Sequence, residues 1–137
     1  MTVSAKTAKT PDHAAHQSGT LSPREQSVLW DMEEHFWTSG ADNAQATTAS
    51  NAVMIFPYPP CILQGDHIWN HMKKRTGWRT AIMAERRVTS CRGIAILTYR
   101  ISAEKPDVPI YKALCASTYL LDEDKWLRLA HQQTTVV

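Results

Sequence analysis

His131 is the residue of this chain whose surroundings most suggest chemistry. It lies in a predicted strand made mainly of leucine and alanine, so we expect its imidazole ring to be at least half buried. A neutral imidazole in such a place can act as a general base or hydrogen-bond a ligand. The alternative is a structural histidine bonded to backbone or to a neighbouring side chain, as buried polar groups usually are. His131 is therefore the candidate catalytic residue, with both interpretations open.

Tyrosines and small residues alternate along a second predicted strand. From Tyr111 to Tyr119 one face reads Tyr, Ala, Cys, Ser, Tyr, in which small side chains leave space and tyrosines supply polar tips. This row is typical of a cavity wall, although ordinary sheet packing gives the same pattern. Cys115 could be a nucleophile if a histidine activated it, or simply a small core residue. The residues expected to contact a ligand are Tyr58, Tyr111, Cys115, Tyr119 and Gln132.

No motif in the sequence predicts a metal or a cofactor. His67 and His71 are four residues apart on a predicted helix and Asp66 is adjacent, but a solvated helix face explains this spacing better than metal ligation. The sequence contains no HExxH or CxxC arrangement, no glycine-rich phosphate loop and no nucleophile elbow. We therefore predict that the protein needs neither a metal nor a cofactor.

Composition and charge argue against several partners. With 15 Lys and Arg against 13 Asp and Glu, a dedicated nucleic-acid surface is not expected, and the basic cluster at 73–75 suits a helix C-terminus. Cys61, Cys91 and Cys115 are far apart, which indicates free thiols in a reducing compartment. The longest apolar run, 52–56, is far shorter than the roughly 18 residues of a membrane helix, and the first residues lack a secretory signal. We expect a cytoplasmic protein that binds no nucleic acid and no membrane.

The order of the predicted elements indicates an α+β domain. Residues 1–20 are polar and small and are expected to form a disordered tail, and residues 21–137 one domain. Capping signals and helical spacing predict helices over 22–39 and 66–75, the second capped by Asp66, with a short helix or turn over 41–49. The stripe of the first helix is Val28, Leu29, Met32 and Phe36. Strands are expected at 53–56, 78–91, 94–102, 110–121 and 126–136, the last four as antiparallel neighbours.

The last predicted turn sets a register for the last two strands. If Leu121 and Trp126 flank that turn, Tyr119 pairs with Arg128, and further along the strands the pairs are Ser117–Ala130, Cys115–Gln132 and Ala116–His131. A slip of one residue would exchange the two faces of the sheet. Neither face is plainly polar, so one is expected to meet the helices and the other a second subunit. This predicts a homodimer formed through the sheet.

Several sequence features occur together in one known superfamily. They are the capped first helix, the Phe56-Pro57 strand end, Gly65 before a helix, the strand 93–100 with Leu-Thr-Tyr-Arg, and the closing run from Trp126 to His131-Gln-Gln-Thr. Over residues 22–136 the chain resembles the nuclear transport factor 2-like superfamily, and within it a bacterial branch near the association domain of calcium/calmodulin-dependent kinase. The resemblance implies a curved, antiparallel-rich sheet of about five to six strands, wrapped on about three N-terminal helices around a conical pocket.

The resemblance leaves two functions open, because this fold carries enzymes, binding proteins and association domains alike. The first is a small-molecule-binding pocket protein, either a binder or an enzyme that acts without cofactor as a lyase or isomerase on an apolar or carbonyl compound. The second is a dimerisation or association module with no catalytic activity. Glu85, the clearest strand carboxylate, is flanked by two arginines, so no ketosteroid isomerase site carries over. A dehydratase-like set of Tyr58, Tyr111, Tyr119 and His131 has suitable residue types.

Overall fold

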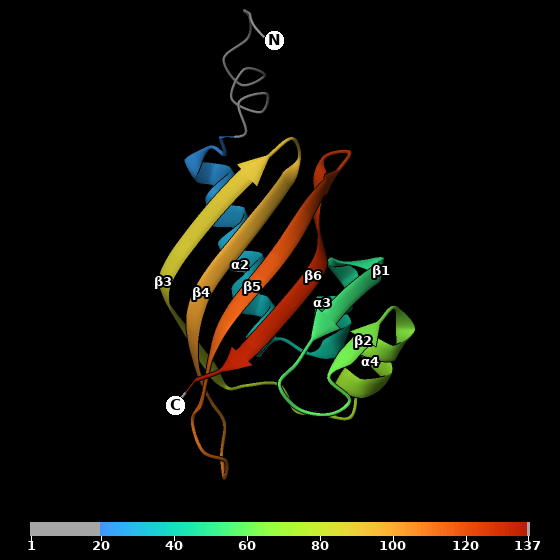
Figure 1. Ribbon diagram of the computed structural model, residues 1–137, viewed down its shortest axis with the longest axis vertical. Helices are drawn as coiled ribbons and strands as arrows, with labels where there is room; N and C mark the ends of the chain where they lie inside the picture. Colours follow the sequence, from blue (N-terminus) through green and yellow to red (C-terminus); the bar gives the residue numbers. More distant parts are fainter. Residues whose placement is uncertain (1–19, 137) are drawn as a thin grey trace, which may run out of the picture.

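A computed structural model describes residues 20–136 as a curved, mixed sheet of six strands with helices packed on one side (Figure 1). The α+β class and the antiparallel-rich sheet expected from the sequence are confirmed. The predicted tail, residues 1–20, lies outside the described residues apart from Thr20. The elements are α2 (Pro23–Thr38), α3 (Ala41–Ala46), β1 (Thr48–Ile55), β2 (Ile62–Gln64), α4 (Asp66–Met72), β3 (Thr80–Cys91), β4 (Ile94–Glu104), β5 (Tyr111–Asp122) and β6 (Lys125–Thr135).

Helix α2 begins at a capping box and lies along one face of the sheet (Figure 1). The Ser22 hydroxyl accepts a hydrogen bond from the Glu25 N–H, and the Glu25 carboxylate accepts one from the Ser22 N–H. Towards the sheet the helix buries Leu29, Glu33, Phe36 and Trp37. The predicted apolar stripe is therefore partly wrong, because Val28 is exposed and a carboxylate takes a place in the stripe.

The four long strands form the predicted antiparallel meander. The sheet order is β2-β1-β6-β5-β4-β3, and β1 runs parallel to β6 while the other neighbours are antiparallel. β1 is longer than expected, beginning at Thr48, and the sequence reading missed β2. Helix α4 ends at Met72, earlier than predicted. Its N-cap is Gly65, at φ 59°, so Asp66 is the first helical residue and not the cap.

A bulge in β6 changes the predicted register. Next to the turn, Tyr119 pairs with Arg128 as expected. Leu129 is then left unpaired, and the rest of β6 is shifted by one residue. The predicted pairs Ser117–Ala130, Cys115–Gln132 and Ala116–His131 are therefore wrong. The observed pairs are Ser117–His131, Cys115–Gln133 and Ala116–Gln132.

The buried apolar side chains form two clusters under α2. One contains Leu29 with Leu97 of β4, and the other contains Phe36 with Met54 of β1 and further residues of β4 and β5. Glu33 lies between Leu29 and Phe36 on the helix, so the two clusters meet at a buried carboxylate. Within residues 20–136 no helix is both long and apolar enough to cross a membrane.

Candidate functional site

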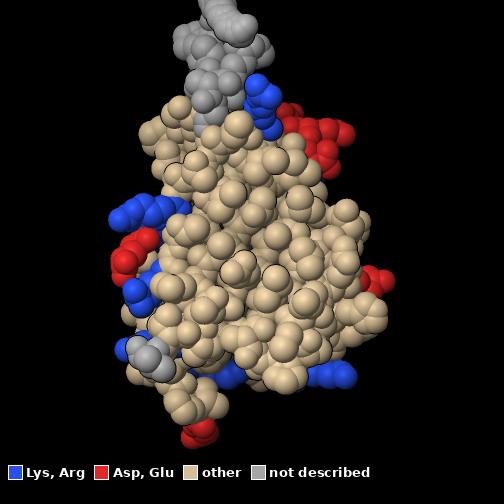
Figure 2. All heavy atoms as spheres, viewed as in Figure 1, with Lys and Arg blue, Asp and Glu red and all other residues tan. Residues whose placement is uncertain are grey.

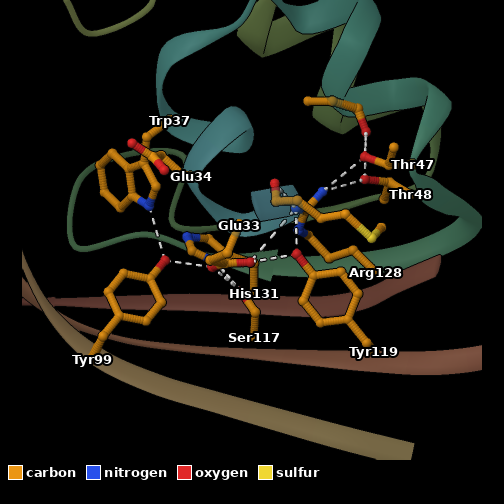
Figure 3. Close-up of polar contacts among 12 residues, drawn as sticks. Glu33, Glu34, Trp37, Thr47, Thr48, Tyr99, Ser117, Tyr119, Arg128 and His131 are labelled. Carbon is orange, nitrogen blue, oxygen red and sulfur yellow. Dashed lines mark hydrogen bonds and ion pairs between the residues drawn. The ribbon is translucent and has the colours of Figure 1, made fainter. Parts of the chain in front are cut away.

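The Glu33 carboxylate is the centre of a polar network that α2 and three strands enclose completely (Figure 3). It accepts hydrogen bonds from the hydroxyls of Tyr119, at 2.6 Å, of Ser117, at 2.5 Å, and of Tyr99. The Tyr99 hydroxyl in turn accepts a bond from the Trp37 indole N–H, at 2.9 Å. Three hydroxyl donors from β4 and β5 therefore converge on one carboxylate from the helix.

Arg128 supplies the positive charge that the buried carboxylate requires. Its Nη2 lies 3.6 Å from the Glu33 Oε1, and both side chains are fully buried. The guanidinium also donates to the Tyr119 hydroxyl at 2.6 Å, to the Met32 carbonyl at 3.2 Å and to the Thr48 hydroxyl at 3.0 Å. It lies over the Phe36 ring, 4.4 Å from the ring centre. These contacts join α2, β1 and β6 through a single side chain.

His131 is held in one tautomer by its neighbours. Its Nδ1 is 2.6 Å from the Ser117 hydroxyl, which donates its own proton to Glu33, so Nδ1–H is the donor to Ser117. Its Nε2 lies 3.0 Å from the amide nitrogen of Gln133 and accepts from it. The Gln133 carbonyl oxygen accepts from the Tyr111 hydroxyl at 2.7 Å, which fixes the amide orientation. His131 is therefore fully buried, with both ring nitrogens bonded within the protein.

The charge states of the network follow from these contacts. Burial by itself raises the pKa of Glu33, but His131, the charge of Arg128 and the Ser117 hydroxyl outweigh it and hold the pKa well below its usual range. Burial lowers the pKa of His131, although Glu33 lies 3.5 Å away. Burial and the Glu33 charge raise the pKa of both Tyr99 and Tyr119. The network is thus a carboxylate and a guanidinium joined by neutral donors.

Beside this network, a cleft opens between the C-terminal end of α2, α4 and the segment after α4. Its volume is about 70 Å³. An engineered apolar cavity of about 150 Å³ holds one benzene molecule, so this cleft admits only part of a small ring. The structure thus has only a small cleft under the end of α2, where the resemblance implied a conical pocket. The cleft is lined by Phe36, Trp37, Ser39, Gly40, Ala41, Phe56, Tyr58, His71, Met72, Arg75, Thr76, Gly77, Trp78, Lys105 and Gln133.

The residues proposed from the sequence are distributed over three places. Tyr58 lines the cleft, and Tyr111 stacks on Trp78 with ring centres 5.5 Å apart. Tyr119 and His131 belong to the enclosed network. Cys115 is buried, and burial raises the pKa of its thiol to about 12, so it is protonated at neutral pH.

Gln132 lies on the exposed face of the sheet, away from the cleft, and Gln133 lines the cleft instead. The reason is the bulge at Leu129, which turns residue 133 and not residue 132 towards the helices.

Sequence reasoning missed Glu33 and Arg128, the two charged residues of the network. A signal for Glu33 was present, since it is four residues after Leu29 and three before Phe36 and therefore on the apolar face of α2. Arg128 faces the predicted cavity wall through its pairing with Tyr119, which the sequence register gave correctly. The described residues contain no group of three His, Cys, Asp or Glu side chains that could hold a metal ion.

Solved structures with a similar fold belong to proteins of several different kinds. No known family model and no curated protein matches the sequence. A candidate ketosteroid isomerase from Parabacteroides distasonis has a TM-score of 0.70 at 16% identity, covering 79% of this chain and 85% of that chain. A nuclear transport factor 2-like protein from Cytophaga hutchinsonii has a TM-score of 0.69 at 10% identity, covering 85% of this chain and 100% of that chain.

A further similar structure, a candidate calcium/calmodulin-dependent kinase II association domain from Exiguobacterium sibiricum, has a TM-score of 0.68 at 14% identity. The match covers 96% of this chain and 98% of that chain. At such identities the similarity concerns the fold alone. The chain has the nuclear transport factor 2-like fold, as the sequence resemblance implied.

The network makes Glu33 the most sensitive position for stability. Glu33→Gln removes the charge that compensates Arg128 and turns an amide N–H towards hydroxyl donors, so we expect a loss of about 3–5 kcal/mol in the free energy of unfolding at pH 7. Glu34→Gln, on the exposed side of the same turn, should change it little. Urea denaturation of both variants measures the difference.

The loss of unfolding free energy caused by Glu33→Gln should depend on pH. The folded-state pKa of Glu33 is lower than the unfolded value of 4.5, so its contribution is complete above that pH and disappears as the pH falls below it. The stability gap between wild type and variant should narrow in acid. A gap that is small at pH 7, or that widens in acid, would contradict an ionised, paired Glu33.

Two substitutions at His131 distinguish a structural from a cavity-facing ring. His131→Gln keeps a polar tip and should cost on the order of 1 kcal/mol. His131→Leu removes the ring nitrogens that bond the Ser117 hydroxyl and the Gln133 amide N–H in a fully buried site, and should cost roughly 1–3 kcal/mol more than glutamine. Equal denaturation midpoints for the two variants would show that the ring bridges nothing.

Proposed function

We propose that this chain acts as an association domain whose copies pair through the outer face of the sheet, the face turned away from α2. The observation that carries this proposal is the character of that face. In Figure 2 its centre is free of lysine, arginine, aspartate and glutamate, which gather along the rim. An uncharged, partly apolar sheet face surrounded by charged residues is typical of a protein–protein interface.

The outer face is built from side chains that alternate with the buried row. Its central members are Ile94, Ile96 and Thr98 of β4, Leu114, Ala116, Thr118 and Leu120 of β5, and Leu127, Gln132 and Thr134 of β6. Leu114, the fourth residue of β5, is 44% exposed. The charged pair of Arg100 and Glu85, 2.7 Å apart, lies towards the β3 edge. A second copy would cover the apolar centre and leave such pairs at the rim.

The two edges of the sheet are poorly suited to pairing, which favours the face. β3 has a bulge between Ala84 and Arg87, with Glu85 at φ 54° and three consecutive charged residues, 85–87. At the other edge, β2 has only three residues. Bulges, charges and short edge strands all oppose edge-to-edge addition of another strand. Association is therefore expected between faces.

A catalytic role has weaker support than association. An acid–base catalyst must come within hydrogen-bond reach of its substrate, and the two groups best suited to this, Glu33 and His131, are sealed and fully bonded. The cleft is also far smaller than the roughly 300–1,000 Å³ of pockets that enclose drug-sized ligands. Similarity to a candidate association domain, at 14% identity, agrees with the association proposal.

Leu114 provides a direct test of the interface. We expect the wild-type protein to sediment as a dimer at tens of micromolar. Leu114→Lys should give a monomer, because pairing through this face would bury the new charge in an apolar contact. Val28→Lys is the matched control: Val28 is also 44% exposed but lies on α2.

Circular dichroism should show both lysine variants folded. A wild-type monomer would remove the association proposal. A Leu114→Lys dimer beside a Val28→Lys monomer would place the interface on the helices.

A second candidate function is the binding of a small molecule in the cleft. Its support is the aromatic lining: Phe56 stacks on Tyr58 with ring centres 5.4 Å apart, and Trp78 stacks on Tyr111. Planar walls of this kind suit a flat apolar group. The two functions are compatible, because the cleft and the outer face lie on different sides of the sheet.

Benzamide, a neutral ring compound, tests the cleft. We expect it to quench tryptophan fluorescence at millimolar concentrations, since Trp37 and Trp78 line the cleft. Ala41→Trp should fill the cleft and abolish the quenching, whereas Ala46→Trp, exposed on the same helix and outside the lining, should retain it. Equal quenching in both variants would place the probe elsewhere.

A further inference from the structure

The charges around the cleft are of one sign. Among its lining residues are Arg75, Lys105 and His71, and there is no aspartate or glutamate. Within residues 20–136, neither Arg75 nor Lys105 forms an ion pair with a carboxylate, whereas Arg100 and Arg128 both do. Two cations therefore lie beside a partly enclosed space, and no carboxylate among the described residues neutralises them.

Aromatic rings hold both cations at the mouth of the cleft. The Arg75 guanidinium lies over the Tyr58 ring, 4.6 Å from its centre, and the Lys105 ammonium lies 4.6 Å from the centre of the Trp78 ring. Lys105 also donates to the Thr76 carbonyl at 3.1 Å. Rings of this kind position a cation without neutralising it, so the donors remain available to an anion.

The surroundings of His71 show the same positive field. Its ring stacks near Tyr58 with centres 6.5 Å apart, and its Nε2 lies 3.5 Å from the Arg75 Nη1. Partial burial and then the positive charges of Arg75 and Lys74 lower the pKa of His71. A nearby anion would offset these charges.

We propose that the cleft binds a small organic carboxylate with a flat apolar body. Arg75 and Lys105 hold the carboxylate at the mouth, and the body lies against the aromatic rings of the lining, which include Tyr58 and Trp78. This inference rests on the second candidate function, binding in the cleft, and adds the chemical class of the ligand. A volume of about 70 Å³ limits the enclosed part to a portion of one ring. A carboxylate suits the site because the planar guanidinium of Arg75 can donate two parallel hydrogen bonds to it.

Benzoate and benzamide test the inference, because they have nearly the same shape and differ in charge. Titration calorimetry at constant ionic strength should show benzoate binding at least about tenfold more tightly than benzamide, the gain expected of charge-assisted hydrogen bonds. Inorganic phosphate, which has no apolar body, should bind more weakly than benzoate. Tight phosphate binding would instead indicate a general anion site and overturn the proposal.

Variants show whether Arg75 and Lys105 cause the preference for benzoate. The double variant Arg75→Gln, Lys105→Gln should lose the preference for benzoate while keeping the affinity for benzamide. Arg79→Gln, a loss of one exposed charge next to Trp78 but outside the lining, should leave both affinities unchanged. Equal binding of benzoate and benzamide would refute the carboxylate proposal and leave cleft binding standing. Failure of every probe to bind would refute both.

Discussion

The buried charge of Glu33 is the constraint on which the arrangement of helix and sheet depends. An ionised carboxylate without water is stable only if it is neutralised and hydrogen-bonded. Here the neutralising charge is that of Arg128 on β6, two hydroxyl donors come from β5 and one comes from β4. If α2 slid or rotated on the sheet, these donors would be separated from the carboxylate and several buried polar groups would lose their partners at once. Apolar packing alone tolerates such shifts, so we infer that the network fixes how α2 sits.

A single inserted residue makes this network possible. In a regular strand, Arg128 and His131 would point to opposite faces, because side chains alternate and the two residues are three apart. The bulge at Leu129 removes this conflict and turns both side chains, together with Gln133, towards α2. The polar centre of the protein is therefore a consequence of a local irregularity in β6.

The sequence predicted most of the elements, but it did not predict how the network and the cleft are assembled, for a physical reason. Strands 80–91 and 111–122 follow from runs of β-branched and aromatic residues, and the pairing of Tyr119 with Arg128 follows from the turn. A bulge leaves no such pattern in the sequence. The predicted ligand contact was therefore Gln132, whereas Gln133 lines the cleft. The cleft itself combines residues from five separate parts of the chain, namely 36–41, 56–58, 71–78, Lys105 and Gln133, and no local periodicity brings these together.

The position of the network also indicates where function can reside. Gln133 lines the cleft, and its amide occupies the Nε2 atom through which the His131 ring would otherwise act on a bound molecule. A ligand in the cleft therefore meets the Gln133 amide, aromatic rings, cations and the His71 ring, and not the ring of His131. The amide of Gln133 and the guanidinium of Arg75 can bind and orient a ligand, but neither takes up a proton at neutral pH. The proposed recognition at the cleft and at the outer face agrees with this arrangement, because the buried acid and base are already bonded to each other's neighbours and hold the helix in place.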